Sequence, residues 1–144
     1  MPRPDTMTAA YVMTPSPRTC SPFSSVLEAV MIFREADCGA VPVVEDGHAV
    51  GVVTDRDIAL ALPDHEADLI DLPVSEIMTR GAVTVTPDTP IDQLVEKFGE
   101  HGVRRLLVAD RQGQLVGIVS WSDVAPYAAD GELGRAVTEV VERP

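Results

Sequence analysis

Two short stretches of the sequence place an acidic residue three positions after a hydroxyl residue. Thr54 and Asp57 follow one apolar run, and Ser120 and Asp123 follow a second. If each hydroxyl residue is the N-cap of a helix, both side chains lie beside the unpaired backbone N–H groups of the first turn. A helix N-terminus of this kind attracts anions such as phosphate. For either stretch alone, the favoured interpretation is a capping box, in which each side chain accepts a hydrogen bond from the other residue's backbone.

The sequence around these stretches repeats, which indicates a tandem duplication. Adding 65 to the residue number takes Met13-Thr14 to Met78-Thr79. After a one-residue insertion, an offset of 66 takes Asp57 to Asp123. Because both copies keep the hydroxyl and acidic pair, the pair is a candidate binding feature as well as a helix cap.

The duplication divides the chain into four parts. We predict a first unit at residues 8–64 and a second unit at residues 73–129. An acidic, proline-broken stretch over residues 65–72 is expected to be a surface linker. Residues 130–144 carry an apolar stripe at helical spacing, which predicts a C-terminal helical tail.

Each copy begins with a short apolar strand that leads into an amphipathic helix. The helices are expected to begin after the N-caps Ser25 and Thr89, with Gly39 and Gly102 as helix stops. Their apolar residues recur at the spacing of a core-facing helix. The predicted buried faces are Val26, Ala29, Val30 and Phe33 in the first copy and Ile91, Leu94, Val95 and Phe98 in the second.

A β-hairpin follows each of these helices, with Gly47 and Gly113 in the turns. A second helix is then expected over residues 57–62 and again over residues 123–129. Each unit is therefore strand, helix, strand, strand, helix. Since neither unit alone covers both faces of so small a sheet, we predict an α+β fold in which the two units pack against each other.

Charge and hydrophobicity exclude several classes of protein. The net charge of −12 and the pI near 4.4 argue against nucleic-acid binding, which depends on basic side chains that neutralise phosphates. No apolar run approaches the roughly 20 residues of a membrane span. The N-terminus also lacks a signal-peptide pattern. We therefore expect a cytoplasmic protein without membrane contact.

Residues suited to catalysis or metal binding lack a recognisable arrangement. His48, His65 and His101 are scattered and do not have the spacing of a zinc site. Cys20 and Cys38 are interpreted as small buried hydrophobic residues. Phosphate-loop and dinucleotide motifs are absent from the sequence. We therefore predict that the protein is not an enzyme and has no metal and no cofactor.

Both copies show a Met-Thr opening, a Thr-x-x-Pro, an apolar helix and a Gly-x-x-Thr/Ser-x-x-Asp motif, and the first adds Val-Pro-Val-Val before an acidic turn. In this order, and duplicated, the motifs resemble a tandem pair of cystathionine β-synthase (CBS) domains over about residues 8–128. The resemblance implies a pseudo-twofold CBS pair with two clefts between the units, which often forms a homodimer. It also implies that adenosine-containing ligands bind there as regulatory signals: AMP, ADP, ATP or S-adenosylmethionine.

The resemblance assigns roles to individual residues. Asp57 would accept the two ribose hydroxyls, Thr54 would hold the phosphate side, and Arg56 is a further phosphate candidate. Asp123 and Ser120 would take the same roles in the second copy. The residues expected to bracket the adenine are Cys20, Ala40, Val41 and Pro42 in the first copy and Val85, Arg105 and Leu106 in the second.

Two departures from the first copy affect the second site. Leu107 stands where the first copy has Pro42, and Trp121 stands where it has Asp55. The bulky Trp121 is a candidate to narrow or cap the second cleft. Arg105 is preceded by Arg104. Either one of these arginines reaches a ligand phosphate, or the two form a simple surface pair.

Two functions are consistent with these residues. The first is a regulatory module that binds an adenine nucleotide or S-adenosylmethionine and passes a conformational signal to an unknown effector protein. The alternative is a structural or interaction module whose clefts are vestigial and which acts through its dimer surface. Retention of both acidic residues favours the first.

Overall fold

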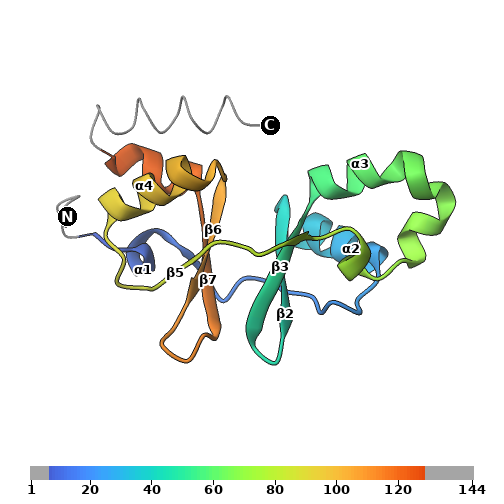
Figure 1. Cartoon of the computed structure of the whole chain (residues 1–144), viewed down its shortest axis with the longest axis horizontal. Coiled ribbons are helices and arrows are strands. Elements are labelled where there is room, and N and C mark those ends of the chain that lie inside the picture. The colour runs from blue at the N-terminus through green and yellow to red at the C-terminus, as the bar shows by residue number, and fades with distance from the viewer. Residues whose placement is uncertain (1–6, 129–144) are drawn as a thin grey trace. The chain divides into compact units, whose positions relative to one another are not determined.

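The computed structural model describes residues 7–128, and these residues form two compact units (Figure 1). Unit 1 combines the N-terminal residues up to Ser16 with the residues from Val83 onward. Unit 2 consists of Pro17–Ala82. The predicted helical tail at 130–144 lies outside the described residues. Mixed helices and strands in both units confirm the α+β class.

Unit 2 contains the first amphipathic helix, α2 (Val26–Ala36). It begins as predicted, because the Ser25 hydroxyl accepts a hydrogen bond from the Glu28 N–H at 3.1 Å. It ends two residues before the expected stop at Gly39, since Asp37 adopts the left-handed conformation with φ 50°. Aspartate tolerates this conformation better than most residues.

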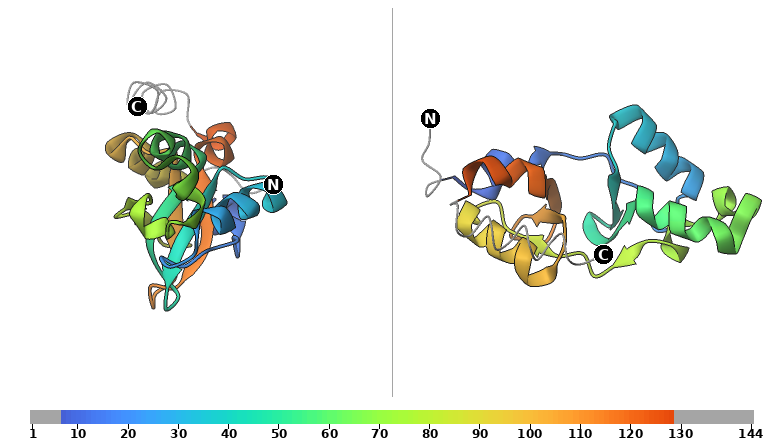
Figure 2. Two further views of the ribbon diagram at one scale, coloured as in Figure 1. Left: turned by 90° about the vertical axis from the view of Figure 1, so that its right-hand side faces the viewer. Right: turned by 90° about the horizontal axis from the view of Figure 1, so that it is seen from above.

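A hairpin and a second helix complete the main body of unit 2 (Figure 2). Strands β2 (Ala40–Glu45) and β3 (His48–Thr54) pair antiparallel around the turn Asp46-Gly47, in which both residues have positive φ. Helix α3 (Asp55–His65) follows β3 directly.

The segment at residues 65–72, which we expect to be a surface linker, is mostly exposed and also has regular structure. Helix α3 continues through Pro63 to His65, and a 3-10 helix, η2 (Glu66–Asp71), follows without a break. The apolar Leu69 is only 3% exposed, so it anchors the acidic segment to the unit. A second 3-10 helix, η3 (Val74–Glu76), then leads to the two-residue strand β4 (Thr79–Arg80).

Unit 1 has the corresponding elements. After α1 (Ala9–Val12) and β1 (Thr14–Pro15), the chain re-enters this unit at β5 (Thr84–Val85). The remaining elements are α4 (Ile91–His101), β6 (Arg105–Ala109), β7 (Leu115–Ser120), α5 (Trp121–Val124) and the 3-10 helix η4 (Ala125–Tyr127). The strand order is β1-β7-β6-β5.

Two helix boundaries in unit 1 differ from the sequence predictions. The N-cap of α4 is Pro90, while the Thr89 hydroxyl accepts from the Thr86 N–H at 3.2 Å and so shapes the preceding turn. The second helix begins at Trp121 and is shorter than predicted, because it passes into η4. Gly102 ends α4 in the left-handed conformation, as predicted.

The opening strands of the two copies are exchanged between the units. In β1, Thr14 lies opposite Ile118 of the second copy, and in β4, Thr79 lies opposite Val52 of the first copy. Each two-residue strand therefore completes the sheet of the other copy. Consequently, the compact units do not coincide with the sequence copies.

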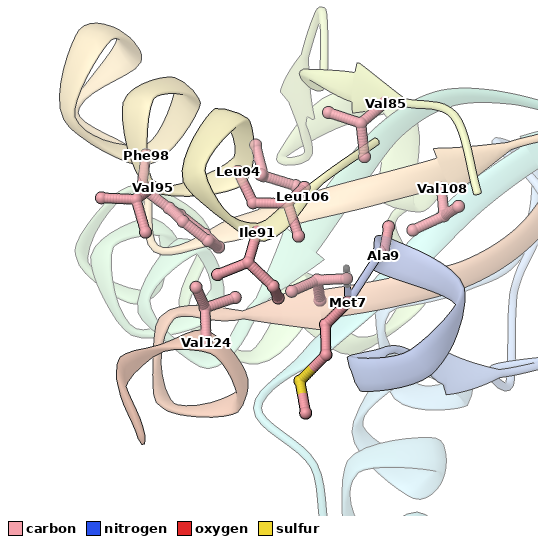
Figure 3. Packing of buried hydrophobic residues seen from close by; sticks show 11 residues of the cluster. Met7, Ala9, Val85, Ile91, Leu94, Val95, Phe98, Leu106, Val108 and Val124 are labelled. Atoms are coloured by element: carbon pink, nitrogen blue, oxygen red, sulfur yellow. The ribbon is translucent and has the colours of Figure 1, made fainter. Parts of the chain in front are cut away.

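Each unit has its own hydrophobic core. Figure 3 shows the core of unit 1, where α4 turns its apolar face toward β6 and Val124 of α5. All four predicted residues of this helix face are buried. On α2, Val26 and Ala29 are buried as predicted, whereas Ile32 takes the buried position and Val30 and Phe33 are half-buried.

Candidate functional site

The hydroxyl and acidic pair of the first copy forms a complete capping box at the start of α3. The Thr54 hydroxyl accepts a hydrogen bond from the Asp57 N–H at 3.1 Å, and Asp57 Oδ2 accepts from the Thr54 N–H at 2.9 Å. Strand β3 delivers Thr54 in an extended conformation with φ −118°, as an N-cap requires. The capping interpretation is therefore correct, although α3 begins two residues before the predicted start at residue 57 and runs to His65 instead of residue 62.

Asp57 also makes a contact that sequence reasoning missed. Thr79 Oγ1 of strand β4 donates a hydrogen bond to Asp57 Oδ1 at 3.2 Å. The available sequence signal was the repeated Met-Thr pair, which marks only the start of a copy and does not reveal its strand partner. The half-buried Asp57 is thus held from two directions.

The equivalent residues of the second copy, Ser120 and Asp123, also form the predicted capping box, at the start of α5. Asp123 Oδ2 accepts a hydrogen bond from the Ser120 N–H at 2.8 Å, and the Ser120 hydroxyl pairs with that of Ser122 at 2.9 Å. Trp121 packs edge to face on Phe98, with ring centroids 5.4 Å apart. The Trp121 ring is therefore part of the packing of unit 1, and its expected role at the second cleft stays a prediction.

The residues expected to bracket the adenine in the first copy lie on two adjacent segments. The Cys20 N–H donates to the Pro42 carbonyl at 3.1 Å, and the Cys20 carbonyl accepts from the Val44 N–H at 2.8 Å. Ala40 and Cys20 are each 8% exposed. Val41 is fully buried, and its side chain belongs to the core of unit 2.

The second copy repeats this pattern. Val85 is 8% exposed, and Leu106 is fully buried in the core of unit 1. Val41 and Leu106 face the cores because alternate residues of a strand face opposite sides of the sheet. Their contact with an adenine base stays a prediction.

The two arginine candidates differ in position. Arg105 is half-buried on β6, directly opposite Ser120 of β7. Opposite residues of an antiparallel pair have Cβ atoms about 4.5–5.5 Å apart, so Arg105 lies beside the second helix cap. Arg56 is exposed in the first turn of α3. This geometry favours Arg105 over Arg56 as a phosphate ligand.

Cys20 is held in its uncharged form. Burial, with a smaller effect from the Glu28 carboxylate, raises the pKa of the Cys20 thiol to about 11. A protonated thiol presents an apolar sulfur surface near neutral pH, which suits contact with a flat aromatic base.

Across residues 7–128, the His, Cys, Asp and Glu side chains form no group of three or more that could hold a metal ion. Within the same range, each helix is too short or too polar to cross a bilayer.

The sequence matches the CBS domain twice, at residues 9–64 and at residues 74–130. The chain belongs to the CBS domain family. The CBS domain-containing protein YhcV of Bacillus subtilis is 36% identical over 129 residues, which cover 89% of this chain and 91% of YhcV. This match confirms the family on which the residue roles were based.

Solved structures of CBS proteins share the fold. The CBS domain protein TA0289 of Thermoplasma acidophilum, described as of unknown function, has a TM-score of 0.79 and 23% identity, covering 92% of this chain and 75% of its own. The CBS domain pair of the protein MJ0100 has a TM-score of 0.74 and 28% identity over 83% of this chain and 98% of its own. MJ0100 was solved in complex with 5′-methylthioadenosine and S-adenosyl-L-methionine.

Proposed function

We propose that this CBS pair is a regulatory sensor of adenosine-containing ligands, namely AMP, ADP, ATP or S-adenosylmethionine. The observation that carries the proposal is the Asp57 carboxylate, fixed at the N-terminus of an 11-residue helix whose N-cap, Thr54, lies opposite the nearly buried Ala40. The adenosyl ligands of MJ0100 support the ligand class. The protein would act in the cytoplasm, without catalysis, and pass its signal to an effector protein.

The chemistry of the site suits a nucleoside. A carboxylate accepts hydrogen bonds from two neighbouring hydroxyls, and charged acceptors make the stronger bonds. The first turn of α3 attracts a phosphate or another negative group. Cys20 and Ala40, each 8% exposed, would contact the base. Asp123, Ser120 and Arg105 would form a corresponding site in unit 1.

Adenine ligands should stabilise the protein against unfolding, and guanine ligands should do so much less. A ligand present at 100 times its dissociation constant raises the free energy of unfolding by about 2.7 kcal/mol. A thermal-shift screen with AMP, ADP, ATP and S-adenosylmethionine, beside GMP and GTP, measures this directly. Calorimetry then gives the affinities. Equal affinities for AMP and GMP, or no shift with any adenosyl ligand, would contradict the sensor.

Exposed apolar side chains favour the alternative function, in which the dimer surface is the functional part. Leu27 and Met31 lie one turn apart on α2 and are 45% and 39% exposed, and Phe23, in the turn before the helix, is 81% exposed. This apolar stripe is suited to packing against a second copy of the chain.

We therefore expect a homodimer that separates when this stripe is charged. Leu27→Glu should give a folded monomer in sedimentation experiments at micromolar concentration, because burying an unpaired carboxylate in an apolar interface is unfavourable. Glu28→Gln, on the same helix turn and exposed, is the matched control and should remain dimeric. A monomeric wild-type protein would rule out the dimer. Dimerisation without any ligand binding would favour the interaction module over the sensor.

A further inference from the structure

The Asp57 side chain is fixed by hydrogen bonds to both of its oxygens. The backbone N–H of Thr54 binds Oδ2, and the hydroxyl of Thr79 binds Oδ1. The first partner belongs to the start of α3, whereas the second lies on β4, which comes from the other sequence copy. Rotation of the carboxylate would break one of these bonds or both.

The remaining acceptor capacity of Asp57 matches a pair of hydroxyl groups. An ionised carboxylate has about four lone-pair positions, two on each oxygen. With one position on each oxygen already used, each oxygen keeps one position for another donor. This arrangement suits the two neighbouring hydroxyls of a ribose, because each hydroxyl can donate to one of the two carboxylate oxygens. A side chain fixed before binding also loses less conformational entropy when the ligand arrives.

Asp123 lacks the second support. Its Oδ2 is bound by the Ser120 N–H, but the equivalent of Thr79 in unit 1 is Thr14, which lies on β1 opposite Ile118. Among the residues that the structure describes, no hydrogen bond joins the Thr14 hydroxyl to Asp123. The two acidic residues of the repeated motif are therefore held differently, although their sequence surroundings are alike.

We propose that Thr79 is a positioning residue for Asp57, and that it makes the site in unit 2 the tighter of the two nucleoside sites. This inference rests on the proposed function and adds the source of the difference between the sites. Thr79 acts through Asp57, since its hydroxyl uses one lone pair of Oδ1 and leaves the other directed at the ligand. The ribose acceptor of the first copy therefore depends on the opening strand of the second.

The experiment measures AMP binding by calorimetry with the Thr79 variants in an Asp123→Ala background, so that only the site in unit 2 is read. Thr79→Val removes the hydroxyl and keeps the shape of the side chain, and it should weaken binding about three- to tenfold, as expected for the loss of one hydrogen bond. Thr79→Ser keeps the hydroxyl and should restore most of the affinity. The matched control, Thr14→Val in an Asp57→Ala background, should leave binding at the site in unit 1 unchanged.

A second ligand separates positioning from a general structural effect. The parent Asp123→Ala protein should prefer AMP over 2′-deoxy-AMP, and Thr79→Val should reduce this preference, because a misplaced carboxylate gains less from the second hydroxyl. If Thr79 has only a structural role, Thr79→Val should weaken the binding of AMP and 2′-deoxy-AMP equally, and this result would overturn the inference. Unchanged AMP affinity in Thr79→Val would also overturn it. If Thr79→Val lowers the melting temperature, the ratio of its affinities for AMP and 2′-deoxy-AMP still decides, because a general loss of stability weakens the binding of both ligands equally. Failure of the wild-type protein to bind any adenosyl ligand would instead reject the proposed function.

Discussion

Gly51→Ala should lower the free energy of unfolding by about 1–3 kcal/mol, the usual cost of forcing extra atoms into a packed site. A Cβ atom at Gly51 would lie 2.7 Å from the Thr79 carbonyl oxygen and 2.9 Å from the Met78 sulfur. The backbone at Gly51 does not have a positive φ, so the reason for glycine here is space. The exchanged strand β4 approaches β3 too closely for any side chain.

The same substitution at Gly117 is the matched comparison. There the added Cβ would meet the side chain of Met13, including its Cγ at 2.9 Å, and no backbone atom is among its nearest neighbours. A flexible methionine can move, whereas a backbone oxygen of a paired strand cannot move without disturbing the sheet. We therefore expect Gly117→Ala to cost less than Gly51→Ala.

Urea unfolding of single and double variants tests this difference. Met13→Ala should suppress most of the additional cost of Gly117→Ala, which appears as a large coupling energy in a double-mutant cycle. Met78→Ala should suppress only part of the cost of Gly51→Ala, since the clash with the Thr79 carbonyl remains. If Met78→Ala restores as much stability to Gly51→Ala as Met13→Ala restores to Gly117→Ala, the close approach of β4 is not what excludes a side chain at residue 51.

Asp57→Ala should weaken adenosyl-ligand binding at the site in unit 2 at least tenfold. Hydrogen bonds to a charged group contribute about 1.5–3 kcal/mol each, and 1.4 kcal/mol corresponds to a factor of ten in affinity. The same substitution removes the bonds to the Thr54 N–H and the Thr79 hydroxyl, so stability should also fall by about 1 kcal/mol. We expect the loss of affinity to exceed that for Asp123→Ala at its own site.

Asp55→Ala is the control for charge at this site. Asp55 lies in the same first turn of α3 and is exposed, and its carboxylate bonds only the neighbouring Arg56 N–H at 2.8 Å among the described residues. Asp55→Ala should change the affinity for AMP little. This control separates the role of Asp57 as a specific hydrogen-bond acceptor from the general effect of removing one negative charge. If Asp57→Ala melts at a lower temperature but binds AMP as well as the wild type, the capping box accounts for the residue completely.

Local signals in the sequence were sufficient for most helix starts and for one helix face. Ser25 and Thr54 cap their helices as predicted, because an N-cap depends only on a side chain and the N–H groups two or three residues later. The buried face of α4 was also predicted correctly, since helical periodicity records which side meets the core. The family followed from the order of such local motifs.

Local signals did not reveal the conformation of residues 65–72. An acidic stretch after Pro63 is typical of an exposed connection, and most of the segment is exposed, but it also forms the 3-10 helix η2 and buries Leu69. Val41 and Leu106 show a related limit, because only the structure reveals that their side chains lie in the two cores. Their contact with a ligand stays a prediction.

The sequence by itself determined the duplication, the repeated Thr/Ser and Asp pair, and the helix cap that each pair serves. Only the tertiary structure decided which copy each opening strand joins. Strand pairing is made by backbone hydrogen bonds, which carry no residue label, and the Met-Thr strands of the two copies are nearly identical. Their exchange places Thr79 beside Asp57 while Asp123 has no such partner among the described residues. Two sites alike in sequence thus differ in structure, because each is completed by a segment distant from it in the chain.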